Sequence, residues 1–164
     1  MKILGIDPGT TRIGYGLIER GRELKLLEYG VIEVRSKTEP NKLLELAKKL
    51  SGLIDALKPE LAGVEKLYFA KNKKTALAVA QARGVILYLL LKKNILIQEL
   101  RPGDVKIAVT GYGLAGKTAV KRMVKKILKI DDLEGYDDAS DALAIAITTA
   151  YSSILSGKLG LDRA

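Results

Sequence analysis

Four acidic residues stand at positions where carboxylates could do chemistry together. Asp7 closes one short apolar run and Glu65 closes another, whereas Asp138 and Asp141 lie at the start of a long apolar segment. A spacing of three places Asp138 and Asp141 on one face of a helix. If the two apolar runs are neighbouring strands, Asp7 and Glu65 project at the same sheet edge, where α/β proteins place their sites. Buried carboxylates are costly unless a cation compensates them, so the pattern points to a metal site.

The composition narrows the chemistry of such a site. The 164-residue chain contains no cysteine and no histidine, which excludes thiol nucleophiles, Ser-His-Asp triads and imidazole metal ligands. An all-carboxylate ligand set suits Mg²⁺, with Mn²⁺ as a substitute, and suits Zn²⁺ poorly. The chain also carries a net charge of +9, which favours a polyanionic partner, nucleic acid first. Carboxylates beside a basic surface predict phosphodiester hydrolysis with two metal ions in each active site.

The positive charge is concentrated in the middle of the chain. Residues 61–130 carry 15 Lys/Arg and 3 Asp/Glu, whereas the remainder carries 13 Lys/Arg and 16 Asp/Glu. We therefore expect the middle of the chain to face the polyanion. Two lysines of this region, Lys106 and Lys117, flank a glycine-rich loop. Ordinary solubilising lysines are the alternative interpretation of the same asymmetry.

Each acidic residue taken singly also fits a structural role. Asp7 could shape the following Pro-Gly turn, and Glu65 could pair with a neighbouring lysine. Asp138 could cap a helix and Asp141 could be an ordinary first-turn acid. The metal-site hypothesis rests on all four together, in the chain order strand, strand, helix.

The periodicity of the apolar residues predicts the elements that hold these acids. Strands are expected over residues 2–7, 12–19, 24–34, 61–65 and 95–100. Helices are expected over residues 40–57, 74–93, 117–130 and 138–155, and residues 106–110 fit either a strand or a helical turn. The first three strands, joined by short turns, predict an antiparallel meander, and the other two fit parallel α/β units. We expect one α/β domain over residues 1–164, with a mixed five-stranded sheet, helices on both faces and about ten loose residues at the end.

Four segments in this order resemble the RuvC family of Holliday-junction resolvases. They are Gly5–Gly9 (GIDPG), Glu65–Asn72 (EKLYFAKN), Gln81–Gly84 (QARG) and Asp138–Ala144 (DASDALA). The resemblance extends over roughly residues 2–152 and implies a ribonuclease-H-like fold. It also implies an endonuclease of recombination and repair that resolves four-way DNA junctions by paired symmetric nicks. Lys66 departs from the pattern, because many members have glutamine there.

The resemblance assigns roles to residues and partners. It implies that Asp7, Glu65, Asp138 and Asp141 are catalytic residues that bind Mg²⁺. It implies a homodimer that acts with a branch-migration motor. Beside Glu65, an aromatic pair followed by lysines suits base stacking and phosphate neutralisation. We therefore expect DNA contacts from Tyr68, Phe69, Lys71, Lys73 and Lys74. The resemblance also implies that Lys106 and Lys117 act near the DNA. Core packing is the alternative for Phe69, the only phenylalanine in the chain.

The most apolar stretch, Thr75 to Leu91, predicts a buried helix or a subunit interface. It is shorter than the ~20 residues that a membrane span needs and includes Gln81 and Arg83. Because two symmetric nicks suit a twofold dimer, we expect an interface there. The expected contacts are Ala78, Val85, Ile86, Leu89 and Leu90. No signal peptide is recognisable at the N-terminus, and we expect a cytoplasmic protein without membrane contact.

Other functions compete with junction resolution. Residues 111–118 match the nucleotide-binding pattern G-x-x-x-x-G-K-[ST], and residues 5–11 are similar to a phosphate loop of sugar kinases and Hsp70-type ATPases. A related nuclease that acts on RNA–DNA hybrids or flaps would use the same acids. A DNA-binding module without catalysis would use the basic surface alone.

Overall fold

The structure is a computed structural model that describes residues 1–67, 73–133 and 137–159. Its centre is a five-stranded sheet in the order β3-β2-β1-β4-β5. The strands are β1 (Lys2–Asp7), β2 (Arg12–Arg20), β3 (Leu24–Glu33), β4 (Leu61–Glu65) and β5 (Leu96–Leu100). β1, β2 and β3 form the antiparallel meander, and β4 and β5 run parallel to β1. The predicted mixed sheet is therefore confirmed, with strand bounds that differ by one residue at most.

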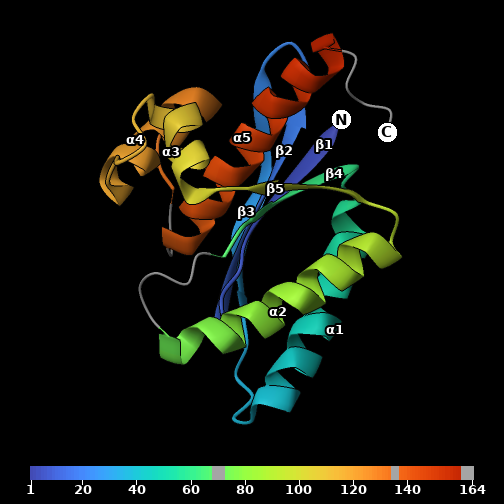
Figure 1. Cartoon of the computed structure of the whole chain (residues 1–164). Helices are drawn as coiled ribbons and strands as arrows, with labels where there is room; N and C mark the ends of the chain where they lie inside the picture. Colours follow the sequence, from blue (N-terminus) through green and yellow to red (C-terminus); the bar gives the residue numbers. More distant parts are fainter. Residues whose placement is uncertain (68–72, 134–136, 160–164) are drawn as a thin grey trace.

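Helices cover both faces of this sheet (Figure 1). On one face lie α1 (Glu39–Leu57) and α2 (Lys73–Lys92). On the other lie α3 (Pro102–Thr110), α4 (Lys117–Leu128) and α5 (Asp137–Leu159). Two hydrophobic cores result, one between the sheet and α1 and α2, the other between the sheet and the last three helices. Burial of both sheet faces explains why β1 and β4 are almost continuously apolar.

Alternation along the strands decides which face each side chain reaches. In β1, Leu4 and Ile6 belong to the core under α1 and α2, and Ile3 belongs to the core under α5. Asp7 follows Ile3 at an even spacing, so its side chain lies on the α5 face. The same alternation in β4 places Glu65 on that face. The parallel register pairs Ile6 with Val64, so the two acids come one step later on adjacent strands.

Glycines let α5 lie unusually close to the sheet. A Cβ atom on Gly5 would come within 2.0 Å of the Ala142 carbonyl oxygen, and one on Gly14 within 2.0 Å of the Asp138 carbonyl oxygen. Both distances are far inside van der Waals contact, so only glycine permits this packing. The first turns of α5 are thereby brought against the ends of β1 and β2, where Asp7 lies.

Two helices differ most from the prediction. Residues 102–110 form a full helix, α3, which begins at Pro102 and is capped at its end by Gly111 with a positive φ of 78°. Because a helix and not a strand precedes the glycine-rich loop, the strand–loop–helix context of a nucleotide-binding P-loop is absent here. α5 continues to Leu159, beyond the expected end at residue 155, and residues 160–164 lie outside the described part.

The predicted interface on α2 was partly wrong. Ile86, Leu89 and Leu90 lie in the core with α1 and the sheet, so they cannot contact a second molecule. The exposed apolar side chains of this helix are Leu77, Tyr88 and Leu91. Within the described residues, α2 is also the one helix long and apolar enough to cross a membrane, over Thr75–Lys92. Its inner face packs on α1 and β5.

Candidate active site

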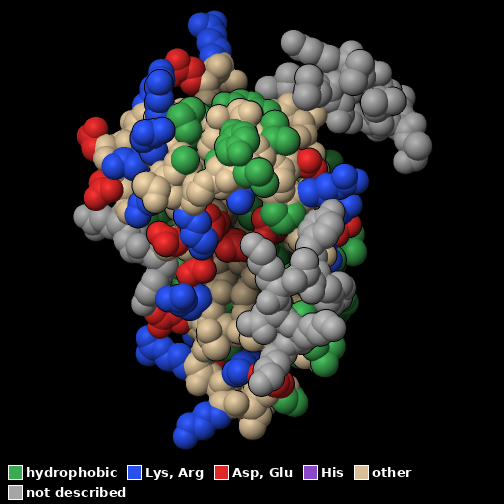
Figure 2. Space-filling view, turned by 60° about the vertical axis from the view of Figure 1, so that its left-hand side comes forward, with side chains coloured by type: hydrophobic (Ala, Val, Ile, Leu, Met, Phe, Trp, Pro, Cys, Tyr) green, Lys and Arg blue, Asp and Glu red, His purple; other side chains and the backbone are tan. Residues whose placement is uncertain are grey.

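Carboxylates from three elements meet at one end of the sheet. Asp7 ends β1, Glu65 ends β4, and Asp141 lies in the first turns of α5. With Lys106 and Lys117 they line a cavity of about 160 Å³. The other lining residues are Pro102, Val105, Val120 and Ala144. Figure 2 shows acidic side chains gathered in a hollow, with Lys and Arg side chains beside them. Three of the four predicted acids are therefore brought together.

Burial and mutual repulsion raise the pKa of the two strand-end acids. Burial is the largest cause for Asp7, followed by the charges of Glu65, Asp141 and Asp138, and its pKa rises to about 8. Burial, then the charge of Asp141, raises the pKa of Glu65 to about 6. Both acids are therefore harder to ionise than in water, and a bound cation would favour their charged forms.

Lys117 supplies positive charge at the site. Its Nζ atom donates to Asp141 Oδ2 at 3.1 Å. This hydrogen bond, and the charge of Asp141, raise the pKa of the Lys117 ammonium. Lys117 also lowers the pKa of both Asp7 and Glu65, and Lys106 acts on Glu65 in the same direction. The two predicted lysines are therefore part of the acidic cluster and not merely near it.

Asp138 takes a different position from the other three acids. Its Oδ2 atom lies 3.4 Å from Arg12 Nε, at the start of β2, and it does not line the cavity. Its charge still raises the pKa of Asp7. Arg12 was not predicted as a site residue, and nothing in its spacing singles it out. Its place follows from the turn after Asp7, which returns the chain along β1.

Arg83 supports the site from behind. Its Nε atom donates to the Glu65 carbonyl oxygen at 3.0 Å, and its guanidinium also pairs with Glu99 on β5. These contacts hold the backbone at the end of β4, where Glu65 lies. Arg83 belongs to one of the four segments that resemble the family, and its role was not predicted from the sequence. Of the predicted DNA contacts, Tyr68, Phe69 and Lys71 lie outside the described residues, as do the side chains of Lys73 and Lys74.

The donor set fits a hard divalent cation. The cavity offers carboxylate oxygens from Asp7, Glu65 and Asp141, which Mg²⁺ and Mn²⁺ prefer. Their raised pKa values would fall if a cation bound beside them. Among the described residues, no three acids stand close enough to form a complete ligand cluster.

Comparison with known proteins identifies the family. The family model described as crossover junction endodeoxyribonuclease RuvC matches residues 3–149. The chain belongs to the RuvC family. The crossover junction endodeoxyribonuclease RuvC of Petrotoga mobilis is 50% identical over 148 residues, covering 89% of this chain and 91% of that protein. The RuvC of Caldicellulosiruptor saccharolyticus is 42% identical over 156 residues, covering 93% and 94%.

Solved structures agree with this membership. The Thermus thermophilus RuvC structure is similar with a TM-score of 0.85 and 27% identity, covering 95% of this chain and 97% of that one. T. thermophilus RuvC in complex with a Holliday junction substrate gives 0.84 and 25%, covering 94% and 96%. The RuvC match confirms the ribonuclease-H-like fold and identifies an endodeoxyribonuclease of a metal-dependent family. All four predicted acids lie within the matched residues 3–149.

Proposed function

We propose that the protein resolves four-way DNA junctions by hydrolysing phosphodiester bonds at the cavity around Asp7. The observation that carries the proposal is the meeting of Asp7, Glu65 and Asp141 beside Lys106 and Lys117, in a RuvC-family fold. Three carboxylates in one cavity favour the binding of cations, and the two lysines beside them suit a phosphate. A relative of this fold has been solved with a Holliday junction substrate bound, which supports this choice of DNA.

Asp7, Glu65 and Asp141 would hold divalent cations, Mg²⁺ with Mn²⁺ as a substitute, two in each site. Such cations neutralise charge on the scissile phosphate and make water a better nucleophile. Asp7 and Glu65 come from adjacent strands and are fixed by the sheet, so they would fix the positions of the cations. Asp138, beside Arg12 and outside the cavity, would complete a ligand set or orient the attacking water from the start of α5.

Lys106 and Lys117 would bind the phosphate oxygens. Lys117 is 70% exposed at its side chain, so its ammonium can leave Asp141 and reach a strand lying over the cavity. In doing so it frees an oxygen of Asp141 for a cation. The negative charge of the acids and that of the DNA are thus both balanced by groups at the same opening. Lys66 is exposed beside Glu65 and has no assigned role.

A second copy of the chain would cover the outer face of α2. Leu77, Gln81, Gly84, Tyr88 and Leu91 are all exposed, and their spacing places them along one side of the helix. A twofold dimer through this face would carry two sites related as the two cleaved strands are related. In this proposal the exposed face takes the place of Ile86, Leu89 and Leu90, which are buried. We also propose that the protein acts with a branch-migration motor and that it is cytoplasmic.

The proposal is tested by cleavage of an end-labelled four-way junction with Mg²⁺, beside a reaction with EDTA. A linear duplex and an RNA–DNA hybrid of the same sequence are the comparison substrates. Paired nicks at symmetric positions, in the junction and with Mg²⁺ only, are expected. Cleavage of the hybrid in preference to the junction would keep the active site and contradict the substrate. Tight junction binding without cleavage under any divalent metal would contradict the enzyme.

The dimer is tested separately. Tyr88→Glu places a charge in the middle of the exposed α2 face and is expected to give a monomer by sedimentation. Leu44→Glu adds the same charge at an exposed leucine on α1 and is the matched control. A Tyr88→Glu protein that sediments as the parent does would place the dimer interface elsewhere.

A further inference from the structure

Three large apolar side chains are exposed on the segment that joins Lys106 to Lys117, the two lysines of the cavity. Ile107 on α3 is 55% exposed, and Tyr112 and Leu114 on the loop that follows are 60% and 79% exposed. These three residues are called the loop tip below. Gly113 lies against Ile107, because a Cβ atom there would be 3.3 Å from Ile107 Cγ1. The loop that carries Tyr112 and Leu114 therefore folds back against Ile107.

The chain holds this surface rigidly. The Gly111 amide donates to the Ile107 carbonyl at 2.8 Å, and the Ala115 amide to the Tyr112 carbonyl at 3.1 Å. The Thr110 hydroxyl accepts from the Tyr112 amide at 3.1 Å and lies 2.8 Å from the Lys106 carbonyl. Ala115 is buried in the core beneath. A loop fixed in this way presents its apolar side chains at little entropic cost on binding.

Along the sequence, the loop tip lies between the two lysines of the active site. Lys106 comes one residue before Ile107, and Lys117 comes three residues after Leu114. Both line the cavity. Arg122 lies about one and a half turns after Lys117 on α4, is exposed and adds positive charge. In Figure 2 hydrophobic side chains gather on the same face as the acidic hollow, with Lys and Arg side chains among them. This rim of cations favours a polyanion over an apolar protein surface.

We propose that the loop tip binds unstacked bases of the DNA, with Tyr112 as a stacking platform next to the scissile phosphodiester. This inference rests on the proposed function. An aromatic ring and an aliphatic side chain beside phosphate-binding lysines suit nucleotides whose base faces are open. A continuous duplex offers no open base face, whereas the centre of a four-way junction does. The loop tip would therefore favour junctions over duplex, and the lysines alone would not.

The test uses Asp7→Asn protein, which keeps the DNA intact during binding. A four-way junction carries 2-aminopurine at the point of strand exchange, and a duplex carries it at the same sequence position. Tyr112→Ala is expected to weaken junction binding about tenfold and to remove the fluorescence change that stacking causes. Tyr112→Phe is expected to retain both. Duplex affinity should not change in either variant. Leu44→Ala, at an exposed leucine on α1, is the control.

Two results would overturn the inference. Equal junction affinity and an unchanged fluorescence signal in Tyr112→Ala would show that no base contacts the ring. An equal loss on junction and duplex would show a contact with the backbone and not with open bases. Failure of the Asp7→Asn parent to bind the junction would contradict the proposed function itself. A thermal melt of each variant checks that the fold is intact.

Discussion

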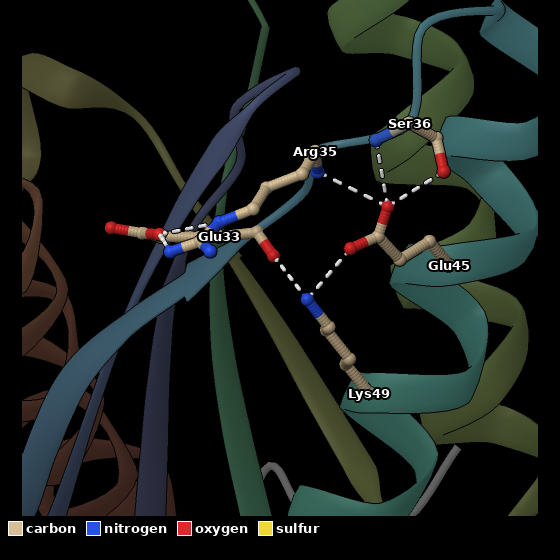
Figure 3. Close-up of polar contacts among 5 residues, drawn as sticks. All are labelled: Glu33, Arg35, Ser36, Glu45 and Lys49. Carbon is tan, nitrogen blue, oxygen red and sulfur yellow. Dashed lines mark hydrogen bonds and ion pairs between the residues drawn. The ribbon is translucent and has the colours of Figure 1, made fainter.

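Two carboxylate clusters in this molecule have opposite electrostatics. Glu45 on α1 accepts hydrogen bonds from the Ser36 hydroxyl at 2.7 Å, the Ser36 and Arg35 amides, and Lys49 (Figure 3). The hydrogen bond from Lys49, then those from Ser36, lower the pKa of Glu45 to about 2. Asp7 has other carboxylates as neighbours and a pKa of about 8. The hydrogen bonds around Glu45 link the end of β3 to α1, whereas the carboxylates around Asp7 repel one another.

The contrast separates a structural acid from a functional one. Donors around Glu45 are supplied by the chain itself, so the charge stabilises the fold. At Asp7, burial and the neighbouring carboxylates outweigh the charge of Lys117, so the charged form is disfavoured and a bound cation would favour it. Perturbed acids in a cavity are a mark of active sites, and here the perturbation and the cavity coincide.

The largest expected effect is on cleavage by Asp7→Asn. Removing this ligand should lower the nicking rate at least about 10³-fold, because several kcal/mol of charge stabilisation at the phosphate are lost. Junction affinity should be kept or should rise, since one negative charge near the phosphates is gone. Asp131→Asn, at an exposed acid beyond α4, is the matched control and should cleave as the parent does. Parental nicking by Asp7→Asn would remove Asp7 from the active site.

A smaller effect is expected from Lys117→Met. The variant frees Asp141, so Mg²⁺ or Mn²⁺ should bind about 2- to 5-fold more tightly in calorimetry without DNA. Cleavage should nevertheless fall about 10²-fold, because a phosphate contact is lost. Lys121→Met removes the same charge one turn along α4 and should leave the metal affinity unchanged. Weaker metal binding in Lys117→Met would contradict competition between the ammonium and the cation.

The pH dependence of stability sharpens the comparison further. The pKa of Asp7 is raised in the folded state, so its contribution is fully present below about pH 4 and is lost as the pH rises to about 8. Asparagine imitates the protonated form. In EDTA, Asp7→Asn should therefore match the parent in Tm near pH 4 and exceed it by several degrees at pH 8. Scanning calorimetry across this range checks it, and a constant difference would contradict the raised pKa.

Much of the site could be predicted because the local sequence determines where strands end and where helices begin. Short apolar runs that end in Asp7 and Glu65 predict both strands, and the even spacing within each strand selects the face. The exact closeness of α5 was not predictable, because Gly5 and Gly14 have many uses and only the packing shows which one applies. The same is true of Arg12, whose partner Asp138 is distant in sequence.

The errors of the prediction have a common origin. The helix α3 is short and its apolar residues, such as Val105 and Val109, fit a strand period as well as a helical one. The predicted interface residues on α2 were partly wrong because an apolar helix has a buried side and an exposed side. Composition alone does not distinguish the two sides. Burial settles it: Ile86 points inward, and Tyr88 points outward.

The smallest expected effect belongs to Glu45. Its pKa is lowered in the folded state, so its contribution is present above about pH 4.5 and is lost as the pH falls toward 2. Glu45→Gln should lower the Tm at pH 7 by about 1–4 °C, because contacts near the surface are screened by solvent. The cleavage rate should not change. Glu39→Gln removes an exposed carboxylate that pairs with Lys42 and should lower the Tm less. If Glu45→Gln instead slowed cleavage while Asp7→Asn did not, the assignment of the two clusters to structure and to function would have to be exchanged.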